Sequence, residues 1–267
     1  MEFSRGLIDS SGYERAGFAS LYDRFRPRPP EALLDVLCRY VRRESAALVV
    51  DLGCGTGLST RAWAGRAERV VGVEPNAAML ATAEAAPGVE FREAFAQDTG
   101  LDDGCADIVT CSQSLHWMEP EPTFAEAARI LRAGGVFAAY DYDWPPVIDA
   151  EVDEAFVAYQ ARRARARERR GLKRGADIWP KSEHLSRMRA SGRFRFCREL
   201  VLHSIETGDA ERVVGFARSL GMPVADMSDA QLEEELRVDE LGAAARKALG
   251  ERTVPFLFGY RVRVGVR

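Results

Sequence analysis

The feature that most constrains this chain is an apolar run that ends in a glycine loop. Residues Leu48 to Leu52 are mostly apolar and β-branched, and the loop that follows holds Gly53, Gly55 and Gly57. A short apolar run bounded by glycines predicts a buried strand of a parallel sheet. Because glycine has no Cβ, the backbone can turn sharply there and approach a ligand closely. The segment therefore predicts a ligand site at the carboxyl end of a strand, where open α/β sheets bind their ligands.

A second apolar run, from Val70, ends in the acid Glu74. A carboxylate at this place, about 20 residues after a glycine loop, is typical of ribose recognition in a βαβ unit. The glycines are spaced G-x-G-x-G, and Leu58 stands where a dinucleotide site has its third glycine. Asp51, just before the loop, disfavours a pyrophosphate and favours a ligand with an ammonium group and a cationic sulfur. S-Adenosylmethionine carries both groups.

The order of apolar runs predicts an α/β fold with a Rossmann-like, doubly wound and mostly parallel sheet. Strand-like and helix-like segments alternate over the first half of the chain, which indicates parallel strands joined by helices. An N-terminal stretch, residues 12–43, is expected to form a helical cover. The expected strands cover residues 48–52, 70–74, 89–93, 107–112, 136–140, 194–206 and 253–266.

Four segments carry a resemblance to a known family: DLGCGTG, GVEPN, ADIVTCSQSLHW and RILRAGGVFAAYDYD. With them the chain resembles class I S-adenosylmethionine-dependent methyltransferases, in the subgroup with a His-Trp pair after the fourth strand. The resemblance implies methyl transfer from S-adenosylmethionine to a small organic acceptor, with S-adenosylhomocysteine as the product. It also implies that an antiparallel pair of strands closes the sheet.

The resemblance also implies roles for particular residues. In the family, the glycine loop holds the methionine part of the cofactor, the acid after the second strand holds the ribose, and an N-terminal Tyr and Arg contact the methionine carboxylate. Many members have an acid that binds the adenine amine where this chain has Phe95, so we expect that contact to be replaced, for example by stacking. The expected cofactor-binding residues are Tyr22, Arg26, Asp51, Gly53, Gly55, Gly57, Glu74, Asn76, Met79, Ala96, Gln97 and Ser112.

The segment after the fourth expected strand lacks the Asn or Asp followed by Pro-Pro that is typical of nucleobase and glutamine methyltransferases. His116 is either a general base or a structural histidine, because its ordinary pKa lies near physiological pH. A base is not essential, since positioning alone supplies roughly 7–11 kcal/mol in well-oriented reactions. The expected acceptor-binding residues are Tyr13, Trp117 and Trp179, and no metal site is expected.

Residues 144–181 are expected to form an inserted helical lid over the acceptor, because paired prolines and Trp179-Pro180 bound the segment. Its basic run is either a solvated helix face or an anion site that uses Arg163, Arg167, Arg170 or Arg174. The expected division of the chain is a cover at 1–45, a cofactor-binding core at 46–143, the lid at 144–181 and the rest of the core at 182–267.

Charge and cysteine content limit the functional classes. The 267 residues carry a formal net charge of −4, which gives no general attraction to nucleic acid or anionic membranes. Five cysteines without C-x-x-C spacing favour reduced thiols and a cytoplasmic protein. Three alternatives stay open: a cofactor-binding protein without catalysis, a nicotinamide dehydrogenase, and an RNA methyltransferase that uses the basic run. The identity of the acceptor and the oligomeric state stay undetermined.

Overall fold

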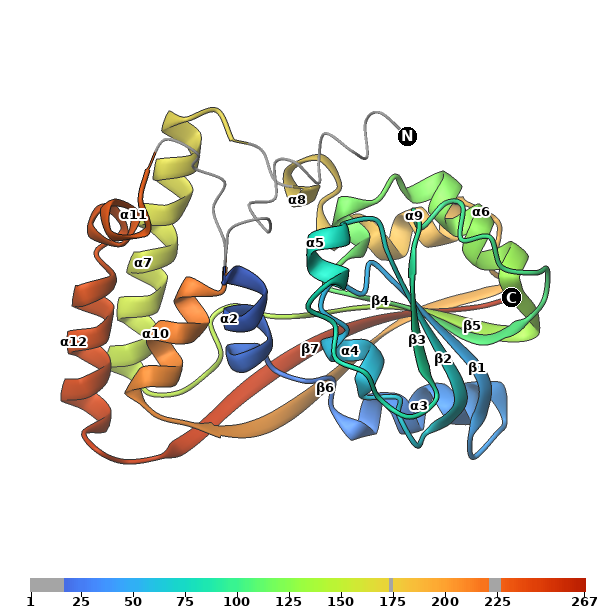
Figure 1. Ribbon diagram of the computed structural model, residues 1–267, viewed down its shortest axis with the longest axis horizontal. Helices are drawn as coiled ribbons and strands as arrows, with labels where there is room; N and C mark the ends of the chain where they lie inside the picture. The colour runs from blue at the N-terminus through green and yellow to red at the C-terminus, as the bar shows by residue number, and fades with distance from the viewer. Residues whose placement is uncertain (1–16, 173–174, 221–226) are drawn as a thin grey trace.

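The computed structural model describes residues 17–172, 175–220 and 227–267. Within them lies a seven-stranded sheet of order β3-β2-β1-β4-β5-β7-β6 (Figure 1). The first five strands pair in parallel, and β7 pairs antiparallel with both β5 and β6. The predicted Rossmann-like fold with an antiparallel end is therefore confirmed. The strands are β1 (Ala46–Leu52), β2 (Ala67–Glu74), β3 (Val89–Glu93), β4 (Ala106–Ser112), β5 (Leu131–Tyr142), β6 (Phe196–Gly208) and β7 (Val254–Val266).

Two hydrophobic cores form because successive residues of a strand point to opposite faces of the sheet. Val49 of β1 and Ile108 of β4 belong to the core under α3, whereas their neighbours Val50 and Val109 belong to the core under α6. Burial on both faces explains why these strands read as continuous apolar runs in the sequence. The helices that flank the sheet are α3 (Glu31–Val41), α4 (Leu58–Arg61), α5 (Ala77–Leu80), α6 (Pro120–Ile130) and α9 (His184–Ala190).

A separate group of helices, which we call the helical layer, lies beside the sheet (Figure 1). The long strands β6 and β7 reach from the sheet toward these helices. Phe256 and Phe258 of β7 share a core with Phe156 of α7 and Phe216 of α10, which makes the helical layer continuous with one side of the sheet. The layer consists of α2 (Phe18–Phe25), α7 (Ala150–Arg169), α10 (Ala210–Arg218), α11 (Asp229–Leu236) and α12 (Val238–Leu249).

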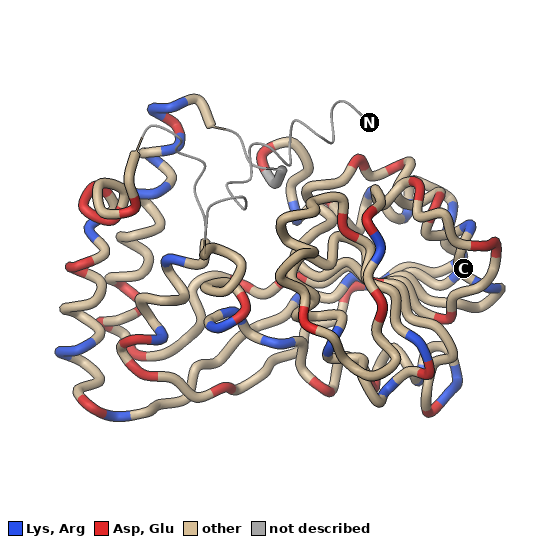
Figure 2. Tube along the Cα trace, viewed as in Figure 1, with Lys and Arg blue, Asp and Glu red and all other residues tan. Residues whose placement is uncertain are grey.

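The arginines of the basic run, at the end of α7, make contacts within the protein that neither sequence interpretation predicted. Figure 2 shows basic segments of α7 beside acidic segments of α11. Arg170 donates 2.6 and 2.9 Å hydrogen bonds to the carboxylate of Glu235 on α11, and Arg163 donates to the carbonyl oxygen of Leu220 at 2.6 Å. Arg167 lies near Asp177, with 3.7 Å between the charged groups. Arg163 and Arg170 therefore hold the helical layer together, Arg167 reaches the short helix α8 (Gly175–Ile178), and Arg174 lies outside the described residues.

Candidate functional site

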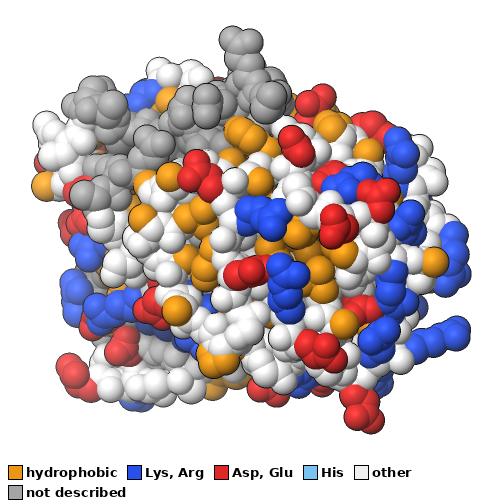
Figure 3. All heavy atoms as spheres, turned by 45° about the vertical axis from the view of Figure 1, so that its right-hand side comes forward, with side chains coloured by type: hydrophobic (Ala, Val, Ile, Leu, Met, Phe, Trp, Pro, Cys, Tyr) orange, Lys and Arg blue, Asp and Glu red, His pale blue; other side chains and the backbone are white. Residues whose placement is uncertain are grey.

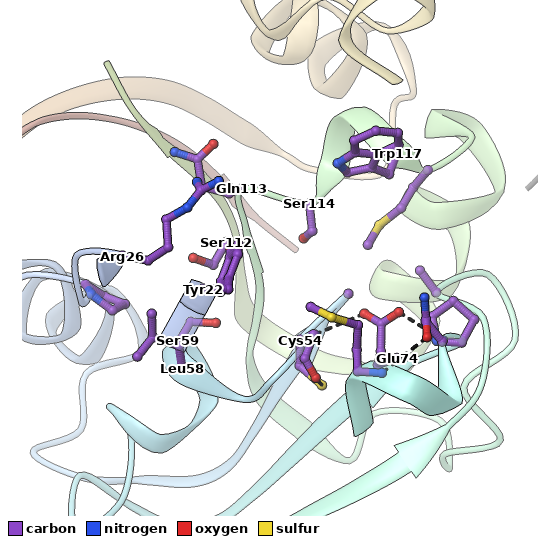
Figure 4. A pocket seen from close by; sticks show the side chains of 18 of the residues that line it. Tyr22, Arg26, Cys54, Leu58, Ser59, Glu74, Ser112, Gln113, Ser114 and Trp117 are labelled. Atoms are coloured by element: carbon purple, nitrogen blue, oxygen red, sulfur yellow. Dashed lines mark hydrogen bonds between the residues drawn. The ribbon is translucent and has the colours of Figure 1, made fainter. Parts of the chain in front are cut away.

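A cavity lies where strands β1, β2 and β4 end, beside α2. Figure 4 shows its labelled side chains in two groups. We call the side of the cavity with Glu74 the Glu74 end and the side with Arg26, Tyr22, Ser112 and Gln113 the Arg26 end. The lining residues that follow β2 and β3 (Asn76, Met79, Ala96 and Gln97) belong to the Glu74 end, and Tyr142, which contacts Arg26, belongs to the Arg26 end. The loop with Gly53 and Gly55 lies in the wall between them. The position agrees with the rule that ligands bind at the carboxyl ends of parallel strands.

The glycine loop is held against β2 by its backbone. The amides of Gly53 and Cys54 both donate to the carbonyl oxygen of Val73, at 2.7 and 3.1 Å. Gly53 has a φ of +67° and Gly57 one of +79°, a conformation that side chains other than glycine rarely adopt. A Cβ on Gly53 would lie 2.7 Å from the Cβ of Ser114, so this glycine is needed for close packing as well as for the turn.

Gly57 does not line the cavity, although it was expected to bind the cofactor. A Cβ at this position would lie 2.5 Å from the ring of Phe91 on β3. Gly57 precedes α4 as its N-cap. A glycine is therefore needed at this position for the turn into α4 and for close packing against β3.

Glu74 is fixed at the end of β2 by two backbone donors. Its Oε2 accepts from the amide of Gly55 and its Oε1 from the amide of Asn76, each at 3.0 Å. Burial raises the pKa of Glu74, while these two backbone hydrogen bonds act to lower it. An ionised carboxylate has about four acceptor positions, so each oxygen keeps capacity for a further donor. Such a carboxylate is oriented to receive two hydroxyl groups, as a ribose offers.

Asp51 lies behind the cavity wall and is not among the residues that line it. Its carboxylate accepts from the hydroxyls of Ser59, Thr60 and Thr110, at 2.6 to 2.8 Å. Burial raises its pKa, and these hydroxyls act to lower it. Two of these hydroxyls belong to α4 and one to β4, so the structure places the Asp51 carboxylate behind the wall, and its expected contact with the cofactor stays a prediction. Through these hydrogen bonds, Asp51 of β1 connects to α4 and β4 beneath the loop.

Asn76 carries a buried donor beside the Glu74 end. Its Oδ1 caps α5 by accepting from the amides of Ala78 and Met79. Its Nδ2 is buried, and no acceptor for it is found among the described residues. Buried polar groups normally have a partner, so this amide favours a ligand that supplies an acceptor. Ala96, Gln97 and Phe95 line the cavity nearby, where the sequence expectation placed the adenine.

Arg26 is held firmly at the opposite end. Its guanidinium donates to the hydroxyl and carbonyl oxygens of Ser219, at 2.9 and 2.6 Å, and to the hydroxyl of Tyr142 at 2.6 Å. It also lies over the rings of Tyr22 and Trp144, 4.5 and 4.7 Å from their centres. Arg26 thus places positive charge at this end of the cavity and also joins α2 to the end of α10 and to β5.

His116 and Trp117 diverge within one 3-10 turn, Leu115–Trp117. Residues in such a turn are separated by about one third of a revolution, so neighbours face different directions. Trp117 lines the cavity, but His116 does not. The Nδ1 of His116 instead lies 3.9 Å from the Oδ1 of Asp141 on β5. Of the two roles that the sequence leaves open for His116, this position favours the structural one.

The remaining expected acceptor residues do not meet at this cavity. Trp179 is absent from the residues that line it and lies under the guanidinium of Arg187, 5.1 Å from the ring centre. Tyr13 lies outside the described residues. Of the two that the structure describes, Trp117 lines the cavity and Trp179 does not.

Sequence reasoning missed several residues of the cavity wall. Ser114 donates its hydroxyl proton to the carbonyl oxygen of Leu52 at 2.7 Å, which fixes the loop after β4 to the end of β1. Tyr142 was missed because the fifth strand was expected to end at residue 140, two residues before its observed end. The alternation of apolar and polar residues in Tyr140-Asp141-Tyr142 was the signal that could have extended the strand. Other lining residues missed include Pro27, Pro29, Leu58, Ser59 and Met118.

Comparison with known proteins supports the same interpretation of the core. Residues 50–139 match the family model described as a methyltransferase domain. An uncharacterized methyltransferase of Mycobacterium tuberculosis is 40% identical over 116 residues, which are 43% of this chain and 46% of the relative. Trans-aconitate 2-methyltransferase of Azoarcus sp. (strain BH72) is 37% identical over 131 residues, 46% of this chain and 51% of the relative. The matches thus span about half the length of these curated relatives.

A solved structure is similar over a larger part of the chain. It is described as that of a proposed type II methyltransferase from Anaeromyxobacter dehalogenans, with 27% identity and a TM-score of 0.70. The similarity covers 91% of this chain and 98% of that protein. Taken with the glycine loop, the buried Glu74 and the strand order, these findings identify residues 50–139 as a methyltransferase domain and give the chain the fold of class I S-adenosylmethionine-dependent methyltransferases.

Proposed function

We propose that this protein transfers a methyl group from S-adenosylmethionine to a small organic acceptor that carries a carboxyl group. The observation that carries the proposal is the Glu74 end of the cavity. Glu74 is oriented by two backbone amides, and the nearby Nδ2 of Asn76 is a buried donor without an acceptor among the described residues. Together with the close approach that Gly53 and Gly55 permit, these groups fit an adenosine better than a pyrophosphate.

The Arg26 end favours an anionic partner. The guanidinium of Arg26 and the hydroxyl of Tyr142 are polar groups there, and Ser112 and Gln113 add side chains that can donate hydrogen bonds. Guanidinium groups bind carboxylates well because the hydrogen bonds are charge-assisted. Two similar proteins have names that refer to acidic substrates: trans-aconitate 2-methyltransferase, and malonyl-[acyl-carrier protein] O-methyltransferase of Pectobacterium atrosepticum. These features support a carboxylate on the methionine part, the acceptor or both.

In the proposed reaction the chain chiefly positions its ligands. The cofactor supplies an electrophilic methyl group on a sulfonium. Glu74 binds the ribose, the loop with Gly53 and Gly55 lets the backbone approach, and Arg26 neutralises negative charge at the other end of the cavity. A near-attack alignment can supply roughly 7–11 kcal/mol without a proton transfer. His116 has no direct part in this scheme, and we propose that it supports the loop that carries Trp117.

The alternative of an RNA methyltransferase has less support. Arg163, Arg167 and Arg170 of the basic run are engaged with a carbonyl oxygen or an acidic side chain of the protein. Figure 3 shows acidic and basic side chains interspersed on the face it presents. No helix of the described residues has the length and apolar character needed to cross a membrane. A cytoplasmic setting belongs to our proposal and is supported by the five free cysteines.

The test is a calorimetric titration of the purified protein with S-adenosylhomocysteine and, separately, with NAD. We expect binding of the first and none of the second, whereas the reverse result would support the dehydrogenase. Incubation with S-adenosylmethionine and a panel of small carboxylic acids, trans-aconitate included, then tests turnover by the gain of one methyl mass. Binding without turnover over acids, alcohols and amines would favour the non-catalytic cofactor-binding protein.

A further inference from the structure

A chain of polar and charged side chains leads from the Arg26 end of the cavity across β5 and β7 to β6. Lys181 lies 2.8 Å from the Oδ1 of Asp141 on β5, and the Oδ2 of Asp141 accepts from Arg263 on β7 at 2.9 Å. Arg263 also donates to Glu199 on β6 at 2.8 Å. At the cavity, Lys181 donates to the Oε1 of Gln113. We call these five residues the Asp141 cluster.

Burying the charged groups of this cluster costs desolvation free energy, which favours a role for the cluster beyond stabilising the fold. Asp141 and Arg263 are 6% and 3% exposed. Although burial raises the pKa of Asp141, Lys181 and His116 hold it below its ordinary value. Buried ion pairs seldom stabilise a fold more than apolar residues of the same volume would. Their directional contacts do, however, fix the positions of the groups that they join.

Gln113 is the member of the cluster that lines the cavity. Its φ of +53° is left-handed, a conformation that costs a residue with a side chain about 1–2 kcal/mol. The two other non-glycine residues with positive φ among those described, Arg42 and Arg237, stand at helix ends. Strained residues persist where their surroundings hold them in place, often at functional sites. Two contacts hold Gln113 in place. Its side chain accepts a hydrogen bond from Lys181, and its backbone N–H donates to the carbonyl oxygen of Tyr140 at 2.9 Å.

The contact with Lys181 also decides which way round the Gln113 amide lies. An ammonium group has only donors, so it must face Oε1, and Nε2 is then directed away from Lys181. Nε2 lies 3.4 Å from the carbonyl oxygen of Tyr142, another residue of the Arg26 end. Gln113 therefore presents an N–H donor group, with fixed orientation, to this end of the cavity.

Lys181 belongs to the long excursion between β5 and β6 that carries α7. Asp141 stands just before the excursion, so the Asp141–Lys181 pair closes it at its base, beside the cavity. The excursion is thereby tied to the loop after β4 through one side chain. A change at Lys181 should reach Gln113 without altering Glu74, which lies in the other group of Figure 4.

We propose that Lys181 is a positioning residue: it fixes the amide of Gln113 so that the Arg26 end can bind the part of the cofactor beyond the ribose. The inference rests on the proposed function, because it assumes that adenosine occupies the Glu74 end. Lys181, which lies outside the core motifs, thereby helps to determine how S-adenosylmethionine is bound.

Two ligands separate the two ends of the cavity. Adenosine would contact only the Glu74 end, whereas S-adenosylhomocysteine would reach the Arg26 end as well. We expect Lys181→Met to lose about tenfold in affinity for S-adenosylhomocysteine, the effect of one hydrogen bond to a charged group. Its affinity for adenosine should not change. Isothermal titration calorimetry with both ligands gives the ratio of the two affinities. A general loss of stability would lower both affinities by the same factor and leave this ratio unchanged.

The matched control is Lys247→Met. It removes an exposed lysine of α12 that pairs with Glu151 of α7. It should leave both affinities unchanged, and Lys181→Arg should restore most of the lost ratio. Gln113→Leu should reproduce the defect, and the double variant Lys181→Met/Gln113→Leu should lose no more than Gln113→Leu alone. A Lys181→Met ratio within about twofold of the parent, or additive losses in the double variant, would overturn the inference.

Lys181→Met removes a cation beside buried Asp141, so it carries a risk of unfolding. Gln113→Leu leaves the ion pairs of Asp141 in place and then serves as the deciding variant, with an unchanged ratio again overturning the inference. If the parent protein binds neither ligand, the proposed function itself is wrong. If the parent binds both ligands and the variants keep its ratio, only the role of Lys181 is wrong.

Discussion

The cofactor-binding half of the sheet and the helical layer are built on different principles. In the first half, the central strands β1 and β4 are buried on both faces, and the glycine loop after β1 is fixed by the backbone hydrogen bonds of Gly53 and Cys54 to Val73. In the helical layer, long helices meet through aromatic packing and through ion pairs such as Arg170 with Glu235. Directional backbone contacts tolerate little change, whereas surface ion pairs contribute little individually. We therefore expect substitutions near β1 and β2 to be far more damaging than comparable ones in the helical layer.

The largest expected effect is that of Glu74→Ala on cofactor affinity. The change removes two charge-assisted hydrogen bonds to the ribose, each worth roughly 1.5–3 kcal/mol, so affinity for S-adenosylhomocysteine should fall well over tenfold. Titration calorimetry measures it, with Glu93→Ala as the control, because Glu93 is the exposed neighbour of Glu74 on β3. Equal affinity in Glu74→Ala and the parent would remove the basis for placing the ribose here.

Gly57→Ala should have the next largest effect, on stability. The left-handed conformation costs about 1–2 kcal/mol for alanine, and displacement of the Phe91 ring adds about 1–3 kcal/mol. Gly65→Ala is a matched control, because Gly65 has a similar φ of +77° and open space where the Cβ would stand. Urea unfolding of both variants isolates the packing contribution. If both variants lose the same stability, close packing at Gly57 does not matter.

Lowering the pH should destabilise the protein through His184. This side chain is 1% exposed, and burial lowers its pKa to about 4. Its ordinary pKa is about 6.5, so between these values the unfolded chain binds a proton that the folded protein does not. Stability from this residue is therefore present above pH 6.5 and is lost as the pH falls, by about 2 kcal/mol between pH 7 and pH 5.

The measurement is urea unfolding of the parent and of His184→Gln at both pH values. The variant should lose less stability on acidification than the parent does. His203→Gln, at an exposed position of β6, is the control and should behave as the parent. A parent whose stability does not change between pH 7 and pH 5 would contradict the buried neutral state of His184.

Glu235→Ala should have the smallest effect and tests the tolerant side of the comparison. It breaks the ion pairs with Arg169 and Arg170. Ion pairs close to the surface are worth roughly 0.2–1 kcal/mol each, so the melting temperature should fall slightly while affinity for S-adenosylhomocysteine stays the same. Glu234→Ala, at an exposed position on the same helix, is the control. A clear loss of cofactor affinity in Glu235→Ala would show that the helical layer and the cavity are coupled more tightly than their construction indicates.

The residues that sequence reasoning placed well share one property: their role follows from local chain geometry. Glu74 and Gly53 could be predicted because a strand, a tight turn and a helix fix their positions within a few residues. His116 and Trp117 were harder, because two adjacent residues of a 3-10 turn face different ways and only packing decides which one meets the cavity. Arg170 was harder still, since its partner Glu235 lies 65 residues away.

By itself, the sequence determined the parallel core, the glycine loop, the carboxylate at the end of β2 and the resemblance to methyltransferases, because strand periodicity and short motifs act over distances that the chain order controls. Only the tertiary structure decided that Asp51 faces inward to three hydroxyls, that the arginines of α7 pair within the helical layer, and that Lys181 reaches Gln113. These contacts join residues far apart in the chain. Their partners depend on how whole elements dock, and docking is fixed by side-chain packing over the entire surface of each element.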